Sequence, residues 1–393
     1  MIETYTAITL EADDPEIAVG EILEQLNFGK NARKNSAAII HCATDFIDTG
    51  VYQAVCKALP CRTIGVTTLG FAVHDSVSEI ALTVMLLTGD DFEFAIGLTD
   101  PITEADENII KRIYDETAAK MTDTPKLALS YFPLKTLSVG AGGDFIIQSM
   151  NKIAAGVPVF GTMPIDNTHD FRDARILLDG GCYDDRFAFM LVGGKSFAPR
   201  FYLGSVSKSQ IRSQPAMVTK SDGNFLYEIN NTPVVDYLKK DLKIEFNERD
   251  AAMVHLIPLL IDLNDGMPAM ARAINEITED NVGVCSANIP VGASVQVSRF
   301  GPSVVIEATN ETLENLLKKE RNAGGILIYS CAARYWALGL DTTIEMDLVE
   351  KIMEPERLPY MLGYSCGELC PLQNETGELA NRFHNYTIIV CVW

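Results

Sequence analysis

The feature that most constrains the fold is an alternation of short apolar runs with amphipathic stretches. Residues 5–10, 37–42 and 63–67 are apolar runs of strand length, whereas residues 15–26 and 49–59 place apolar side chains at helical spacing. Asp14 precedes the first of these stretches and is a suitable N-cap. Helices between successive strands are typical of sheets that are covered by helices. The first hundred residues therefore predict mixed α/β structure.

The next hundred residues repeat this plan. The segment MLLTG at 85–89 aligns with MLVGG at 190–194 at an offset of 105 residues. In both copies an apolar run stands on each side of the aligned glycine, which predicts hairpins over residues 80–98 and 187–203. We therefore expect two copies of a strand–helix–strand–hairpin unit.

Glycines at similar corners support the repeat. The Ile64-Gly65 corner resembles Phe160-Gly161 at an offset of 96 residues, and Gly363 stands at a comparable corner much later in the chain. The third glycine suggests a third, more distant copy of the unit. A helix is also expected over residues 144–155, with Asp144 as its own cap.

The length of 393 residues favours two domains over one core. Residues 206–224 are polar and contain Pro215, so we place a linker there, between a domain of residues 1–205 and a domain of residues 225–393. In the second domain we expect helices at residues 234–242, 311–322 and 348–353. Strands are expected at, among others, residues 254–263, 303–307 and 326–330. The predicted architecture is α/β, with mixed sheets flanked by helices.

Charge and composition exclude several classes of partner. The chain carries 53 acidic and 32 basic residues, a net charge of −21, so binding to nucleic acid or to an anionic membrane is not expected. No secretory signal and no apolar run of about 20 residues is present, which predicts a soluble cytoplasmic protein. Nine cysteines without a regular spacing indicate free thiols.

Polar groups converge in the last 36 residues. An apolar run at 358–364 is followed by Cys366, Glu368 and Cys370, and His384 and Asn385 precede a final apolar run at 386–393. A few polar groups at the end of a buried strand are typical of a binding site.

Several motifs resemble the FIST domain family (F-box and intracellular signal transduction proteins). The segment GYSCGE at 363–368 with FHNYT at 383–387 resembles the C-terminal signature of the family, and SCAAR at 330–334 resembles its Ser-Cys-x-x-Arg segment. The segment IGVTTLG at 64–70 is similar to the motif of the N-terminal half, although Phe71 stands where a glutamate is usual. The resemblance implies a sensory module that binds a small ligand, proposed to be an amino acid or a related carboxylate metabolite, and that signals to a separate protein.

Arg334 is the first candidate for ligand binding, because a guanidinium can hold a carboxylate through two hydrogen bonds. In this hypothesis Arg334 binds the carboxylate of an amino acid and Glu368 binds its ammonium group. The alternative is a structural ion pair of Arg334 with a neighbouring acid such as Glu368. For His384 we favour a bracing hydrogen bond over ligand contact. The full predicted set is Ser330, Cys331, Arg334, Tyr364, Cys366, Gly367, Glu368, His384 and Asn385.

Two other functions remain open. Cys331 or Cys366 with His384 would suit a cysteine-dependent hydrolase or transferase, in which Glu368 orients the imidazole. The second open function is that of a scaffold that signals through protein contacts alone. No cofactor is expected, and the dispersed histidines and irregular cysteine spacings predict no metal site.

Overall fold

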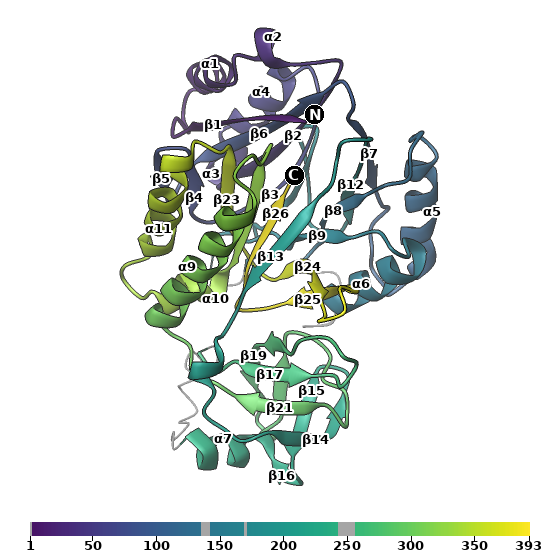
Figure 1. Cartoon of the computed structure of the whole chain (residues 1–393), viewed down its shortest axis with the longest axis vertical. Coiled ribbons are helices and arrows are strands. Elements are labelled where there is room, and N and C mark those ends of the chain that lie inside the picture. The colour runs from purple at the N-terminus through teal and green to yellow at the C-terminus, as the bar shows by residue number, and fades with distance from the viewer. Residues whose placement is uncertain (1, 135–141, 169–170, 243–255) are drawn as a thin grey trace.

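The computed structural model describes residues 2–134, 142–168, 171–242 and 256–393. It consists of a large body, in which helices surround three sheets, and a smaller lobe at one end of the body (Figure 1). The α/β class with mixed sheets and flanking helices is confirmed.

The body contains three related units. In each unit two parallel strands pair with each other, and the first of them also pairs with an antiparallel third strand. The units, in this order, are β2 (Asn35–Cys42), β3 (Arg62–Thr67) and β6 (Leu82–Gly89); β8 (Leu127–Tyr131), β9 (Val159–Thr162) and β12 (Ala188–Gly193); and β22 (Ile326–Cys331), β23 (Tyr360–Ser365) and β26 (Ile388–Val392). The structure thus contains the third copy that Gly363 suggested.

Each sheet is completed by strands from the other units. A short hairpin from one unit pairs with the second parallel strand of another, and a single outer strand pairs with the antiparallel strand. The hairpins are β4–β5 (Phe71–Val73 and Ser76–Ser78), β10–β11 (Ile176–Leu178 and Gly181–Tyr183) and β24–β25 (Glu368–Gln373 and Leu379–His384). The outer strands are β1 (Glu3–Thr9), β7 (Glu93–Leu98) and β13 (Arg200–Gly204).

This exchange corrects two sequence expectations. The predicted hairpins at residues 80–98 and 187–203 are wrong, because β6 and β7 belong to different sheets, as do β12 and β13. Thr88-Gly89-Asp90-Asp91 therefore connects two sheets. A strand that is buried on both faces has the same apolar run whichever sheet it joins, so the pattern identified the strands but not their partners.

Helices cover the outer faces of the three sheets. They are α1 (Pro15–Leu26), α2 (Phe28–Asn31), α3 (Asp45–Asp48) and α4 (Val51–Ala58) near the first sheet; α5 (Glu107–Ala118) and α6 (Gly142–Ile153) near the second; and α9 (Pro302–Lys319), α10 (Ala332–Ala337), α11 (Ile344–Met353) and the 3₁₀ turn η2 (Glu354–Glu356) near the third (Figure 1). The Asp14 carboxylate caps α1 by accepting from the backbone N–H groups of Glu16 and Ile17.

Two local predictions in these helices are wrong. Residues 303–307 are the start of α9 and not a strand, because Pro302 occupies the first helical turn and the buried residues Val304, Val305 and Ala308 follow helical spacing. Asp144 lies inside α6, and its carboxylate accepts from the backbone N–H of Asn288 at 2.5 Å instead of capping its own helix.

The inner faces of the three sheets enclose one apolar core. At its centre the Tyr329 hydroxyl lies 3.0 Å from Nε2 of His41 and 2.7 Å from the Tyr131 hydroxyl, so one residue from each unit joins a single chain of hydrogen bonds. Burial lowers the pKa of His41 to about 3, so its imidazole is neutral at pH 7.

The lobe is a separate β structure with its own core. Its strands are β14 (Ala216–Asp222), β15 (Phe225–Ile229), β16 (Thr232–Pro233), β17 (Leu259–Asp262), β18 (Met270–Arg272), β19 (Ile274–Ile277), β20 (Gly283–Cys285) and β21 (Ser294–Val297), with helix α7 (Val234–Leu242). Part of the strand expected at residues 254–263 lies outside the described residues. Residues 206–224 run from β13 through the turn η1 (Lys208–Gln210) into β14, and β22–β26 return to the body. The division into domains of residues 1–205 and 225–393 stays a prediction.

Candidate functional site

The predicted site residues separate into three groups around the ends of β22 and β23. Ser330, Arg334 and Tyr364 surround a carboxylate that the sequence reading did not include. Cys331, Cys366, Gly367 and Glu368 form a second group, and His384 with Asn385 lies toward the lobe.

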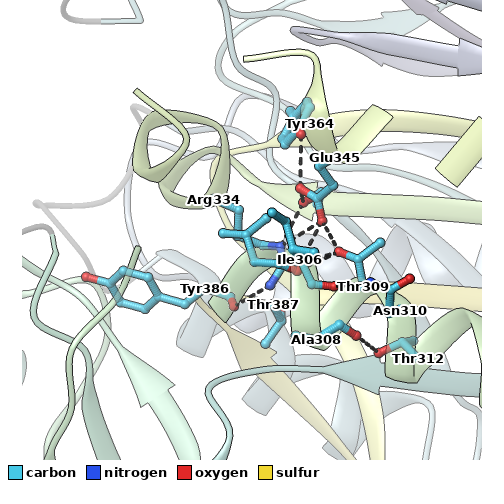
Figure 2. Close-up of polar contacts among 12 residues, drawn as sticks. Ile306, Ala308, Thr309, Asn310, Thr312, Arg334, Glu345, Tyr364, Tyr386 and Thr387 are labelled. Atoms are coloured by element: carbon cyan, nitrogen blue, oxygen red, sulfur yellow. Dashed lines mark hydrogen bonds and ion pairs between the residues drawn. The ribbon is translucent and has the colours of Figure 1, made fainter. Parts of the chain in front are cut away.

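The guanidinium of Arg334 is committed to a buried ion pair with Glu345 of α11 (Figure 2). Nη2 lies 2.6 Å and Nε 3.1 Å from Oε1 of Glu345. Nη2 also donates to the Thr309 hydroxyl at 2.7 Å and to the Val305 carbonyl at 3.1 Å. Both charged side chains are fully buried, so this pair joins α9, α10 and α11 at the end of the third sheet.

The other carboxylate oxygen of Glu345, Oε2, accepts hydrogen bonds from the two remaining residues of the first group. The Ser330 hydroxyl donates to Oε2 at 2.8 Å, and the Tyr364 hydroxyl donates to it at 2.9 Å. Arg334 therefore makes the structural ion pair that was the alternative to ligand binding, but its partner is Glu345 and not the suggested Glu368. The sequence does contain a signal for the burial of Glu345, though not for its partner, because Glu345 shares one face of α11 with Val349 and Met353 at helical spacing.

Glu368 lies in a different environment, at the start of β24. Its carboxyl group is fully buried and accepts from the Ser365 hydroxyl at 2.9 Å and the Thr387 hydroxyl at 2.8 Å. Burial raises the pKa of Glu368 to about 8, although the two hydroxyls, the Cys331 thiol and the more distant charge of Arg334 act in the opposite direction. Within the described part of the chain this carboxyl has no ion-pair partner. We call Cys331, Ser365, Cys366, Gly367, Glu368 and Thr387 the Glu368 cluster.

The turn that carries this cluster is fixed by backbone contacts with the second unit. Gly367 has a φ of 129°, and a Cβ atom there would lie 2.6 Å from the ring of Phe383. Its carbonyl accepts from the Thr162 hydroxyl at 3.0 Å and from the backbone N–H of Met163 at 3.1 Å. A residue other than glycine would displace the turn, and with it Glu368.

The two thiols of the cluster are held in their protonated form. Burial, followed by the charge of Glu368, raises the pKa of Cys331 well above its ordinary value. Burial also raises the pKa of Cys366 to about 12, and the nearby carboxylates of Glu368 and Asp166 add to this effect. A thiol acts as a nucleophile through its thiolate, so this environment opposes the nucleophilic role considered above.

His384 contacts the paired strand β24, whereas Asn385 contacts the lobe. Nε2 of His384 lies 2.9 Å from the carbonyl of Cys370 on the paired strand β24, and burial lowers the pKa of the imidazole to about 3. The Asn385 side chain accepts from the Ser286 hydroxyl of the lobe. The His384 ring therefore contacts the Cys370 carbonyl and not the Cys331 thiol, for which it was considered as a base.

Arg272 of the lobe, which the sequence reading missed, strengthens the connection beside Asn385. It donates to the carbonyl of Phe383 at 2.7 Å, and its guanidinium lies 3.8 Å from the Asp144 carboxylate of α6. Both side chains are almost completely buried. They come from segments more than a hundred residues apart, so no local pattern links them.

Other types of site find little support in the described residues. Nowhere in the described ranges do three or more His, Cys, Asp or Glu side chains gather in a way that would hold a metal ion. All nine cysteines are free. None of the described helices is both long and apolar enough to cross a membrane.

Comparisons with known proteins identify the family of this chain. The family model for the FIST N domain matches residues 36–232, and that for the FIST C domain matches residues 235–371. Among curated proteins, no sequence matches this chain. A cyanuric acid hydrolase from A. caulinodans resembles it with 8% identity and a TM-score of 0.28, over 50% of this chain and 71% of the hydrolase. T. maritima PurL complexed with FGAR has 10% identity to this chain and a TM-score of 0.19, and the match covers 100% of this chain and 72% of PurL.

Proposed function

The chain belongs to the FIST family, and from that premise we propose that it is a sensory module that binds a small amine-bearing ligand at the Glu368 cluster. FIST domains are associated with sensory roles in signal transduction. Amino acids are the class of ligand that best unites this association with the chemistry of the cluster.

The observation that carries the proposal is a buried carboxyl group without a cation. Ionised carboxylates are costly to bury unless an opposite charge accompanies them. The carboxyl of Glu368 has only hydroxyl and thiol donors in direct contact, and its pKa of about 8 leaves it mostly protonated at pH 7. An ammonium group would supply the missing positive charge and stabilise the ionised form.

For such a ligand we propose an approach past the turn between β23 and β24. Cys366 is half-buried, whereas Cys331, Ser365 and Glu368 are buried. Asp166 lies close enough to Cys366 to affect its pKa, so a cationic group that approaches past Cys366 meets a second carboxylate. This electrostatic arrangement favours amines over carboxylic acids.

The hydrogen bonds that Arg334 already makes within the protein change how an amino acid would be recognised. Because Arg334 already binds Glu345, Ser330 and Thr309, we assign the ammonium group, and not the carboxylate, as the recognised feature at this cluster. Ser330, Arg334 and Tyr364 then support the site by fixing the end of β22, from which Cys331 projects.

A connection to signalling is provided by β24 and β25. Glu368 begins β24, which pairs with β25 along its whole length, and β25 with Asn385 carries the contacts to the lobe. Ionisation of Glu368 by a bound amine would therefore occur on the hairpin that holds the lobe against the body.

A thermal-shift screen tests the proposal with free amino acids and simple diamines as probes, followed by calorimetric titration of those that raise the melting temperature. We expect Glu368→Gln to weaken binding of the selected amine at least tenfold. Glu375→Gln, which changes an exposed carboxylate of the same hairpin, is the matched control and should bind as the natural protein does. Undiminished binding by Glu368→Gln, or no amine that binds, would contradict the proposal.

A further inference from the structure

Two large apolar side chains are exposed at the turn between α10 and α11. Trp336, within α10, is 45% exposed, and Leu340 is 101% exposed. Gly339, just past the end of the helix, adopts a left-handed conformation with a φ of 71°, and Leu340 follows it. An apolar residue at this position of a helix end frequently packs back onto the helix. Leu340 lies entirely in solvent instead.

Trp336 also forms an aromatic stack with the second unit of the body. The centroids of the Trp336 and Phe171 rings lie 5.7 Å apart, with an angle of 18° between the ring planes. Phe171 is itself only partly buried, so solvent reaches this pair of rings from both residues. Tryptophan is among the residues that contribute most to binding at protein–protein interfaces.

The position of Phe171 is fixed by hydrogen bonds to a buried carboxylate. Asp166 accepts from the backbone N–H of Thr168 at 2.5 Å and from that of Asp173 at 2.7 Å. Phe171 lies between these two residues in the sequence and has a φ of 52°, which is unfavourable for a bulky side chain. Unfavourable backbone conformations that the surrounding structure maintains are concentrated at functional sites. The aromatic pair is therefore in place before any partner binds.

Negative charge borders the two exposed apolar side chains. The Glu79 carboxylate accepts from the Tyr335 hydroxyl at 2.6 Å and from the Thr342 hydroxyl, so it is attached to both sides of the turn that carries Leu340. These hydrogen bonds lower the pKa of Glu79, which keeps it ionised at pH 7. Asp341 is exposed and directly follows Leu340.

The sign of these charges decides between possible partners. Residues 335–350 contain four acidic residues and no Lys, Arg or His. Arg172, next to Phe171, lies 3.6 Å from the Asp173 carboxylate, which offsets its charge. A symmetric contact between two copies of the chain would place two acidic surfaces together, which like-charge repulsion opposes. A basic partner has the complementary charge.

We call Glu79, Phe171, Trp336, Leu340 and Asp341 the Trp336 surface. We propose that it is a docking site for a basic segment of another protein that carries large apolar side chains. The apolar side chains of the partner cover Trp336 and Leu340, and its lysine or arginine side chains pair with Glu79 and Asp341. None of these five residues belongs to the Glu368 cluster, so the proposal does not rest on the binding of an amine there.

Synthetic peptides test the proposal on the full chain. The probe is a fluorescein-labelled amphipathic peptide that contains only leucine and lysine. One control peptide has glutamate in place of every lysine, and the other has serine in place of every leucine. In fluorescence-anisotropy titrations we expect the leucine–lysine peptide to bind at least tenfold more tightly than either control, because the surface presents both apolar side chains and negative charge.

Leu340→Ser is the decisive variant, because a side chain that lies entirely in solvent can be replaced without loss of packing. It should weaken binding of the leucine–lysine peptide at least tenfold and leave the melting temperature unchanged. Leu379→Ser, which changes a 49% exposed leucine of β25, is the matched control and should bind as the natural protein does. Asp341→Asn should weaken binding several-fold and reduce its dependence on salt, whereas Glu375→Gln should not.

The fluorescence of Trp336 reports the contact itself. The chain contains two tryptophans, so Trp393→Phe leaves Trp336 as the single one, and the peptides contain none. We expect its emission to shift to shorter wavelength when the leucine–lysine peptide binds. Glu368→Gln should leave peptide binding unchanged, which separates this surface from the amine site.

Three results would overturn the proposal: no binding of the leucine–lysine peptide, equal binding of the lysine and glutamate peptides, or equal binding by Leu340→Ser and the natural chain. Sedimentation velocity tests the other possible occupant, a second copy of the chain. We expect Leu340→Ser to leave the sedimentation coefficient unchanged. A dimer of the natural chain that Leu340→Ser dissociates would show that a second copy covers the surface, and would also overturn the proposal.

Discussion

At the level of single residues, two buried glutamates have opposite surroundings. Glu345 faces a guanidinium and three hydroxyl groups, so it has the partners that a buried charge requires. Glu368 has hydroxyl and thiol donors but no cation in contact, and burial raises its pKa to about 8. The first arrangement is typical of structural support, and the second leaves a place for a ligand.

The raised pKa of Glu368 predicts how stability depends on pH. The folded-state pKa of about 8 exceeds the ordinary value of 4.5, so the stabilising contribution of the protonated carboxyl is complete below pH 4.5 and is lost as the pH rises toward 8. Over this window the ionisation of Glu368 lowers the free energy of unfolding progressively as the pH rises. Glu368→Gln should therefore gain stability relative to the natural protein between pH 5.5 and pH 8.5. Melting curves at both values measure this difference, and an unchanged difference would contradict the burial argument.

The Arg334–Glu345 pair gives a second prediction at this scale. Arg334→Met or Glu345→Met alone leaves one buried charge without its partner and should cost about 3–5 kcal/mol of unfolding free energy. The double variant should cost much less than the sum of the two single changes, because no isolated charge remains. Urea unfolding of the four proteins measures the coupling, and strictly additive costs would show that the pair is not coupled.

At the level of helices and strands, the sequence predicted individual elements better than their partners. The helices over residues 15–26 and 234–242 were predicted at their observed bounds, because an N-cap or a turn and the apolar spacing are local signals. The pairing of β24 with β9, across two hundred residues, has no local signal. The same limit explains the site: Cys366, Gly367 and Glu368 were found as a motif, but Glu345 as the partner of Arg334 was not.

Glycine positions in the parallel strand pairs give a testable prediction for the sheets. A Cβ atom at Gly65 would lie 1.7 Å from the Ile40 carbonyl oxygen, so Gly65→Ala must separate β2 from β3 and should destabilise the protein by more than about 3 kcal/mol. Gly20, on the exposed side of α1, has no atom within 4 Å of such a Cβ. Gly20→Ala should instead stabilise the protein by about 0.5–1 kcal/mol. Denaturant unfolding measures both, and similar effects for the two variants would contradict the close approach.

At the level of the whole molecule, the three units of the body depend on one another for complete sheets. The sheet that contains β22 and β23 also uses β13 and the β4–β5 hairpin, and the sheet that contains β8 and β9 uses β24–β25. Residues far apart in the chain therefore share each hydrophobic layer. The family halves, which follow the sequence, do not coincide with these sheets.

A fragment experiment tests this interdependence. Residues 1–205 alone lack β22, β23 and β26 at the centre of one sheet and β24–β25 at the edge of another. We expect this fragment to show no cooperative thermal transition and to expose apolar surface that binds a hydrophobic dye. A sharp transition with native-like near-ultraviolet circular dichroism would show that the first half folds alone.

The central claim, an amine that ionises Glu368, is tested most directly by counting protons during binding. Calorimetric titrations of the selected amine at pH 7, in buffers of different ionisation enthalpy, give the number of protons released. A carboxyl with a pKa of about 8 is mostly protonated at this pH, so binding should release close to one proton. Glu368→Gln should release almost none. Binding to the natural protein without proton release would contradict the account.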